Sequence, residues 1–169
     1  MSEADATESE SDLIHDETVD LDEGVATTAT QSFNTEFRVM NVETVTYDLT
    51  DASPVVHLLE AEPPFRYLAI PLGLPDAVAM HQAVGHVEGR RPGTHELTTE
   101  ILHRAQIDVI AARILRYEGG IFYAQLDLMT HRGHELIDCR TSDAITLALR
   151  QRVPAPVLCA EEVLAALYV

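Results

Sequence analysis

Apolar and polar residues alternate along several short stretches of the chain, which is the period of half-buried β-strands. Elsewhere the apolar positions recur every three or four residues, as they do in amphipathic helices. These patterns predict strands at residues 37–49, 55–61, 67–72, 109–117, 121–128 and 135–140, a short edge strand at 154–159, and helices at 75–84, 94–105, 142–152 and 161–167. The order βββα, α, βββα, β, α predicts an α+β fold, with a mostly antiparallel sheet packed with helices.

The chain also resembles itself at an offset of 67 residues, without a gap. Pairs at this offset include Val42 and Val109, Ile70 and Ile137, Asp76 and Asp143, and Ala77 and Ala144. This spacing predicts a duplicated βββα unit. Because proline is best tolerated at the first helical residue, Pro75 predicts that Leu74 caps the first helix and that Thr141 caps its counterpart.

The amino-terminal segment differs in composition from the rest of the chain. The first 36 residues contain 11 of the 28 acidic residues and no Lys or Arg. We therefore predict a disordered acidic tail at 1–35 and one folded domain at 36–169. No apolar run reaches the roughly 18 residues of a membrane span, and the start of the chain does not have the pattern of a signal peptide. We expect a cytoplasmic protein with no membrane partner, in which Cys139 and Cys159 are reduced.

Polar residues are concentrated where the strand at 135–140 meets the following helix. Asp138 and Asp143 could bind a divalent cation such as Mg²⁺ or Mn²⁺, and Arg140 with Ser142 could bind a phosphate. The simpler alternative is that Asp138 and Arg140 pair with each other while Asp143 serves the helix dipole. The first unit carries Pro71 and Gly73 where the second carries Asp138 and Arg140. This difference suggests that the first unit is structural and the second functional.

A second candidate is the basic loop that precedes the helix at 94–105. Arg91 lies where a loop enters a helix N-terminus, which is a suitable place for an anion. His95 could transfer protons there, and Glu96 follows it in the first turn. The alternative is a solvated linker with an ordinary helix cap.

Several motifs in residues 37–167 resemble those of the bacterial and plant bifunctional nuclease domain family. They are Gly73-Leu74-Pro75-Asp76-Ala77, Arg91-Pro92 with Thr94-His95-Glu96-Leu97, Phe122-Tyr123-Ala124, and Ile137-Asp138-Cys139-Arg140-Thr141-Ser142-Asp143-Ala144-Ile145. The usual form of the last motif is D-A-R-P-S-D-A-I, so Cys139 and Thr141 depart from it, and Glu96 stands where Asp is usual.

The resemblance implies a nuclease that acts on DNA, RNA or both. The resemblance does not identify the catalytic residues. Our candidates come from the polar strand-to-helix junction and the start of the helix at 94–105, and they are His95, Glu96, Asp138, Arg140 and Asp143. The alternative is a non-catalytic binding or regulatory domain of the same fold, which the excess of acidic over basic residues favours. We expect nucleic acid as a partner. We also expect a homodimer, because the predicted edge strand at 154–159 would leave unpaired backbone groups and because a small duplicated domain leaves apolar faces that self-association commonly covers.

Overall fold

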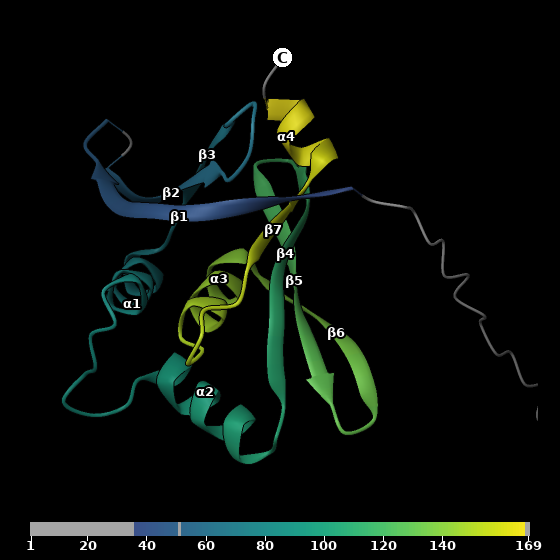
Figure 1. Cartoon of the computed structure of the whole chain (residues 1–169). Coiled ribbons are helices and arrows are strands. Elements are labelled where there is room, and N and C mark those ends of the chain that lie inside the picture. The colour runs from purple at the N-terminus through teal and green to yellow at the C-terminus, as the bar shows by residue number, and fades with distance from the viewer. Residues whose placement is uncertain (1–35, 51, 168–169) are drawn as a thin grey trace, which may run out of the picture. The chain divides into compact units, whose positions relative to one another are not determined.

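The computed structural model of the protein describes residues 36–50 and 52–167 and confirms the α+β fold (Figure 1). Its elements are β1 (Phe37–Asp48), β2 (Ser53–Glu60), β3 (Tyr67–Pro71), α1 (Leu74–Val84), α2 (Thr94–Arg104), β4 (Asp108–Glu118), β5 (Ile121–Thr130), β6 (Gly133–Arg140), α3 (Thr141–Leu149), β7 (Val157–Ala160) and α4 (Glu161–Leu167). The predicted acidic tail at 1–35 lies outside the described residues. Among the helices described, none is long and apolar enough to cross a membrane.

The seven strands form one mixed sheet in the order β3-β2-β1-β7-β4-β5-β6. Neighbouring strands are antiparallel except β4 and β7, which are parallel. Helix α1 packs on β1 and β2, helix α3 packs on β4, β5 and β6, and the two helices contact each other (Figure 1). The core lies between them and the sheet, so the two helix starts are brought close together.

Strand β7 is not the edge strand that the sequence predicted. Val157 pairs with Met40 of β1 on one side and with Ala112 of β4 on the other. Val157 and Cys159 are both buried. The expected unpaired backbone groups at 154–159 are therefore absent from β7, and the edges of the sheet are β3 and β6. This removes one of the two reasons for which the sequence predicted a homodimer.

The offset of 67 residues holds at the helices but not in all the strands. Helix α1 begins at Leu74 and α3 at Thr141, which are 67 residues apart. In β2, however, Val56 and Leu58 are fully buried, and the offset pairs them with Tyr123 and Gln125. Those two residues lie on the face of β5 opposite the buried Ala124, Leu126 and Leu128. A strict ungapped correspondence is therefore wrong in these strands.

The predicted helix caps are also wrong. Leu74 and Thr141 are the first helical residues, and Gly73 and Arg140 are the N-caps, with no side-chain cap hydrogen bond at either. The Thr141 hydroxyl instead donates to the carbonyl of Phe122 at 3.0 Å. This bond joins the start of α3 to the start of β5, where Gly119 and Gly120 form a tight hairpin with positive φ angles of 58° and 84°.

The buried carboxylate of Glu60, at the end of β2, holds several segments of the chain together. Glu60 is 1% exposed. Arg38 Nε donates to its Oε1 at 2.5 Å and Arg66 Nε donates to its Oε2 at 3.0 Å. Arg66 also bonds both carboxylate oxygens of Glu161, at 2.6 and 2.7 Å. The network links β1, β2 and the first residue of α4. It also pairs the buried charge of Glu60, which would be strongly destabilising if it were left unpaired.

Candidate active site

The site is built where the N-termini of α1 and α3 meet. Both N-cap residues have extended backbones, with φ and ψ of −70° and 147° at Gly73 and of −68° and 146° at Arg140. The third helical residue is Asp76 in α1 and Asp143 in α3. Free amide groups and the helix dipole stabilise a carboxylate in a first turn. The helix contact therefore places two such carboxylates near each other.

Arg140 joins the two carboxylates. Its Nε and Nη2 donate to Asp143 at 2.8 and 2.9 Å, and its Nη1 and Nη2 donate to Asp76 at 3.1 and 3.2 Å. The hydrogen bond and the charge of Asp143, with the charge of Asp76, raise the pKa of Arg140. Ser142 supports the arrangement, since its hydroxyl lies 3.3 Å from Asp76 Oδ2. The guanidinium is thus held in one plane at the ends of two helices.

Helix α2 adds a histidine to this cluster. His95 Nε2 lies 3.0 Å from Asp143 Oδ1. Burial alone would raise the pKa of Asp143, but hydrogen bonds from Arg140 and His95 outweigh it and hold that pKa below its usual value. An ionised carboxylate beside an imidazole fixes the orientation of the ring. The pair has the arrangement that a general acid or base requires.

A hollow of about 560 Å³ gives access to these groups. Its lining combines the polar cluster with small and apolar side chains: Pro75, Asp76, Ala79, Thr94, His95, Thr98, Arg140, Asp143 and Leu147. The side chain of Arg140 is 65% exposed, while that of His95 is 16% exposed. A ligand in the hollow could therefore reach the guanidinium directly and the edge of the imidazole from one side.

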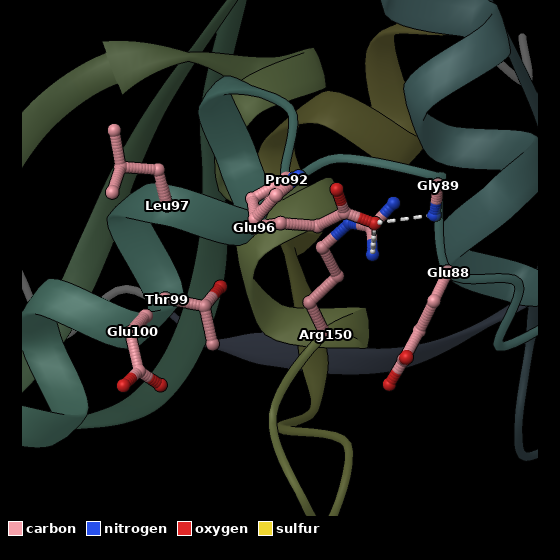
Figure 2. A pocket seen from close by; sticks show the side chains of 8 residues that line it. All are labelled: Glu88, Gly89, Pro92, Glu96, Leu97, Thr99, Glu100 and Arg150. Carbon is pink, nitrogen blue, oxygen red and sulfur yellow. Dashed lines mark hydrogen bonds and ion pairs between the residues drawn. The ribbon is translucent and has the colours of Figure 1, made fainter.

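Glu96, predicted beside His95 as a catalytic residue, is engaged elsewhere. Figure 2 shows its carboxylate between Arg150 and Gly89 in a separate pocket. Oε1 accepts from Arg150 Nη1 at 3.0 Å, and Oε2 accepts from the Gly93 amide at 2.6 Å. The hydrogen bond from the Gly93 amide is the largest influence on the pKa of Glu96 and lowers it, while burial opposes this. The Gly89 amide and Arg150 lower that pKa further. Its contacts tie the start of α2 to the end of α3, which places His95 above Asp143.

Asp138 and Arg140 do not pair, so that interpretation of the sequence is wrong. Asp138 Oδ1 accepts from the Gln125 amide at 2.8 Å, and Arg140 turns instead to Asp76 and Asp143. Asp138 and Gln125 are paired across β6 and β5, on the face opposite the buried Ala124 and Leu126. The structure thus separates Asp138 from the hollow that holds Asp143.

The remaining candidates are a loop arginine, a metal site and a thiol. Arg91 is exposed in the loop between α1 and α2, with no ion pair to any residue that the structure describes. In the described part of the chain, no three His, Cys, Asp or Glu side chains are grouped closely enough to hold a metal ion. The side chains present therefore do not fit a preformed three-ligand cation site. Burial raises the pKa of Cys139 to about 11, so its thiol is not an activated nucleophile.

Asp76 is the site residue that sequence reasoning missed. The first unit was expected to be structural because Pro71 and Gly73 replace the charged residues of the second. Only the packing of α1 on α3 brings Asp76 to Arg140. The signal that could have found it was present, since Asp76 and Asp143 occupy the same first-turn position at the offset of 67.

Comparison with known proteins agrees with the motifs. Residues 56–169 match the family model described as the bifunctional nuclease domain. The chain is also 36% identical over 101 residues to two uncharacterized proteins of Mycobacterium tuberculosis, MT1877 of strain CDC 1551/Oshkosh and Rv1829 of strain H37Rv. Each match covers 60% of this chain and 59% of the relative, so the chain spans less than two thirds of their length. With most of its length matched by the family model, the chain belongs to the bifunctional nuclease domain family.

Proposed function

We propose that the protein is a nuclease that cleaves phosphodiester bonds of DNA or RNA at the cluster formed by Asp76, His95, Arg140 and Asp143. The observation that carries the proposal is the position of Arg140, whose guanidinium lies at the N-termini of two helices and beside the His95–Asp143 pair. Helix N-termini and arginine are both suited to phosphate oxygens. Membership of the family supports the same reaction class.

In this proposal His95 transfers the protons and the other side chains position or stabilise the reacting groups. Asp143 accepts a hydrogen bond from the Nε2–H of His95, which leaves Nδ1 free to accept a proton from water or from a ribose hydroxyl. The oxygen that has lost its proton attacks phosphorus, and Arg140 stabilises the negative charge that develops on the phosphate oxygens. Asp76 and Ser142 hold the guanidinium in position. Histidine then returns its proton to the leaving oxygen.

A requirement for Mg²⁺ or Mn²⁺, with Asp138 and Asp143 as ligands, stays a prediction, as does the cytoplasmic location. The cation is tested by comparing cleavage in EDTA with cleavage after each metal is added back. An Asp138→Asn variant that cleaves normally with added metal would rule out Asp138 as a ligand. No step in the proposed sequence of proton transfers depends on the cation.

A second function is favoured by one specific observation. The positive charge of Arg140 is already matched by two carboxylates, and the chain carries a formal charge of −17. A phosphate must therefore displace a carboxylate from Arg140 or bind beside it against electrostatic repulsion. This arrangement suits a binding or regulatory domain as well as an enzyme.

The two functions are separated by incubating purified protein with labelled single-stranded DNA and RNA. A nuclease should release shorter products, and His95→Gln should abolish their release. His103→Gln is the matched control, because His103 lies on the same helix and is exposed. Equal cleavage by both variants would reject His95 as the catalytic base, and binding without cleavage by the native protein would favour the regulatory domain.

A further inference from the structure

The hollow that holds His95 does not end at Arg140. A second hollow of about 270 Å³ shares Asp76 and Arg140 with it and is lined further on by Ile121 and Phe122. Its lining changes from the charged side chains of Asp76 and Arg140 to the apolar side chains of Ile121 and Phe122. The polar cluster is therefore followed directly by a place suited to a flat, weakly polar group.

A third hollow, of about 440 Å³, continues the groove. It shares Gly120 and Phe122 with the second and is lined by Tyr117 and Tyr67. Gly120 has a positive φ of 84°, and a Cβ atom there would meet nothing within 4 Å. The hairpin between β4 and β5 thus leaves this part of the groove open. Because neighbouring hollows share lining residues, the three together form an extended groove. We call it the aromatic groove after the rings of Tyr67, Tyr117 and Phe122 that line it.

Tyr117 and Tyr67 are the exposed rings of this aromatic groove, while Phe122 is partly buried and packs against the core. The centroids of Tyr117 and Phe122 are 4.6 Å apart with planes tilted by 42°. The backbone of Phe122 is fixed by the hydroxyl of Thr141 at 3.0 Å. Tyr117 is 39% exposed and Tyr67 is 44% exposed, and the Tyr67 ring stacks against that of His57 with centroids 5.3 Å apart. Preorganised rings of this kind lose little entropy when a ligand stacks on them.

We propose that the aromatic groove binds successive bases of a single-stranded nucleic acid while Arg140 binds the adjoining phosphate. Aromatic side chains stack on any base, because every base has a π-face. Bases in a duplex are hidden by their own stacking, so only an unpaired strand can use the rings. This inference rests on the proposed function and extends it, since it names the part of the substrate that lies outside the catalytic cluster.

The charge of the groove favours stacking over phosphate binding as the main source of affinity. Among the side chains that line the three hollows, Arg140 is the only arginine. A single-stranded ligand loses affinity with salt by a logarithmic slope of about −0.7 for each phosphate neutralised. We therefore expect a slope near −1 or shallower, much less than for a basic groove.

The experiment measures fluorescence anisotropy of a labelled oligothymidylate of about twelve nucleotides, within the usual range of site sizes, with phosphorothioate links that resist cleavage. A second probe has the same backbone without bases. Tyr117→Leu and Phe122→Leu should each weaken binding of the first probe by about fivefold or more, since one stacked base contributes on the order of 1 kcal/mol or more. Tyr47→Leu is the control, because Tyr47 is 54% exposed on β1 and lines none of the three hollows.

The abasic probe should bind at least fivefold more weakly than the first and should not distinguish the variants. Equal binding of the two probes, or native affinity in Tyr117→Leu with an unchanged melting temperature, would overturn the inference. The outcome is separate from that of the proposed function. Ring-dependent binding without any cleavage supports the groove and rejects the nuclease, while cleavage that ignores both ring substitutions does the reverse.

Discussion

Arg140 donates through Nη1 to Asp76 Oδ2 at 3.1 Å, although the two residues are 64 positions apart. Arg140 caps α3 and Asp76 lies in the first turn of α1, so this contact joins the starts of the two helices. It also shows that both βββα segments contribute to one site.

Substitution of Arg140 should separate catalysis from stability. Arg140→Gln removes the charge that the proposed reaction needs, so cleavage should fall by at least a hundredfold, as it does when one charge-stabilising donor is lost. Its side chain is 65% exposed, and exposed ion pairs contribute about 1 kcal/mol or less. Thermal melting and cleavage are measured on the same preparation. Arg104→Gln, which breaks an exposed pair with Glu100, controls for loss of a surface arginine. A large drop in the melting temperature of Arg140→Gln alone would assign it a structural role.

Asp76→Asn should reduce cleavage, contrary to the expectation from sequence that the first unit is only structural. The substitution weakens the hold on Arg140 and on the hydroxyl of Ser142. We expect about a tenfold loss of kcat, since misplacing a catalytic group is costly even when it is still present, and a stability change of about 1 kcal/mol or less. Steady-state kinetics check it. Unchanged kcat with lower stability would return Asp76 to a helix-dipole role.

Glu96→Gln tests whether Glu96 acts through position rather than chemistry. The variant loses the charge that pairs with Arg150, whose side chain is 10% exposed. Stability should fall by about 1.5–3 kcal/mol, the range for hydrogen bonds to charged groups. Urea unfolding measures this, and cleavage per folded molecule should stay within a few-fold of native. A complete loss of cleavage in a protein of native stability would make Glu96 catalytic.

The buried carboxylate at Glu60 should make the fold sensitive to acid. Hydrogen bonds from Arg66 lower its pKa to about 2 from the ordinary value of 4.5, although burial alone would raise it. A lowered folded-state pKa means that this stabilisation is complete above pH 4.5 and is lost as the pH falls toward 2. Unfolding free energies measured across this range should decline by up to about 3 kcal/mol. Glu60→Gln should be less stable at neutral pH and should show a flatter acid limb. An equal acid dependence in both proteins would place the titrating group elsewhere.

A homodimer remains a prediction, and the fold suggests a different surface for it. Helix α2 has no buried residue, and Leu97 and Ile101 on it are 54% and 56% exposed. Exposed apolar side chains one turn apart are typical of a self-associating surface. Sedimentation should show a dimer at micromolar concentration, and Leu97→Glu should shift it toward monomer. Val153→Glu, at a position 79% exposed, is the control. A native protein that sediments only as monomer contradicts the prediction.

The sequence predicted the elements well because their signals are local. Alternation placed β5 and β6 within a few residues of their observed bounds, and Gly85 ends α1 as expected. Strand β7 was misplaced because nothing in its own residues says which strands flank it. The same reason applies to the site. Arg140 and Asp143 could be found because they are three residues apart. The contact of Arg140 with Asp76 depends on how the helices pack, and the contact of Asp138 with Gln125 depends on which strand lies beside β6.

The central position of β7 has a consequence for how the protein is made. Strands β1 to β3 and β4 to β6 can each pair among themselves, but the two groups are joined in the sheet only through residues 157–160. During synthesis the polypeptide must therefore wait, with the flanking edges of β1 and β4 unpaired, until these four residues have left the ribosome. A chain that stops before Val157 would have two strand groups without a shared strand, joined through the contact of α1 with α3.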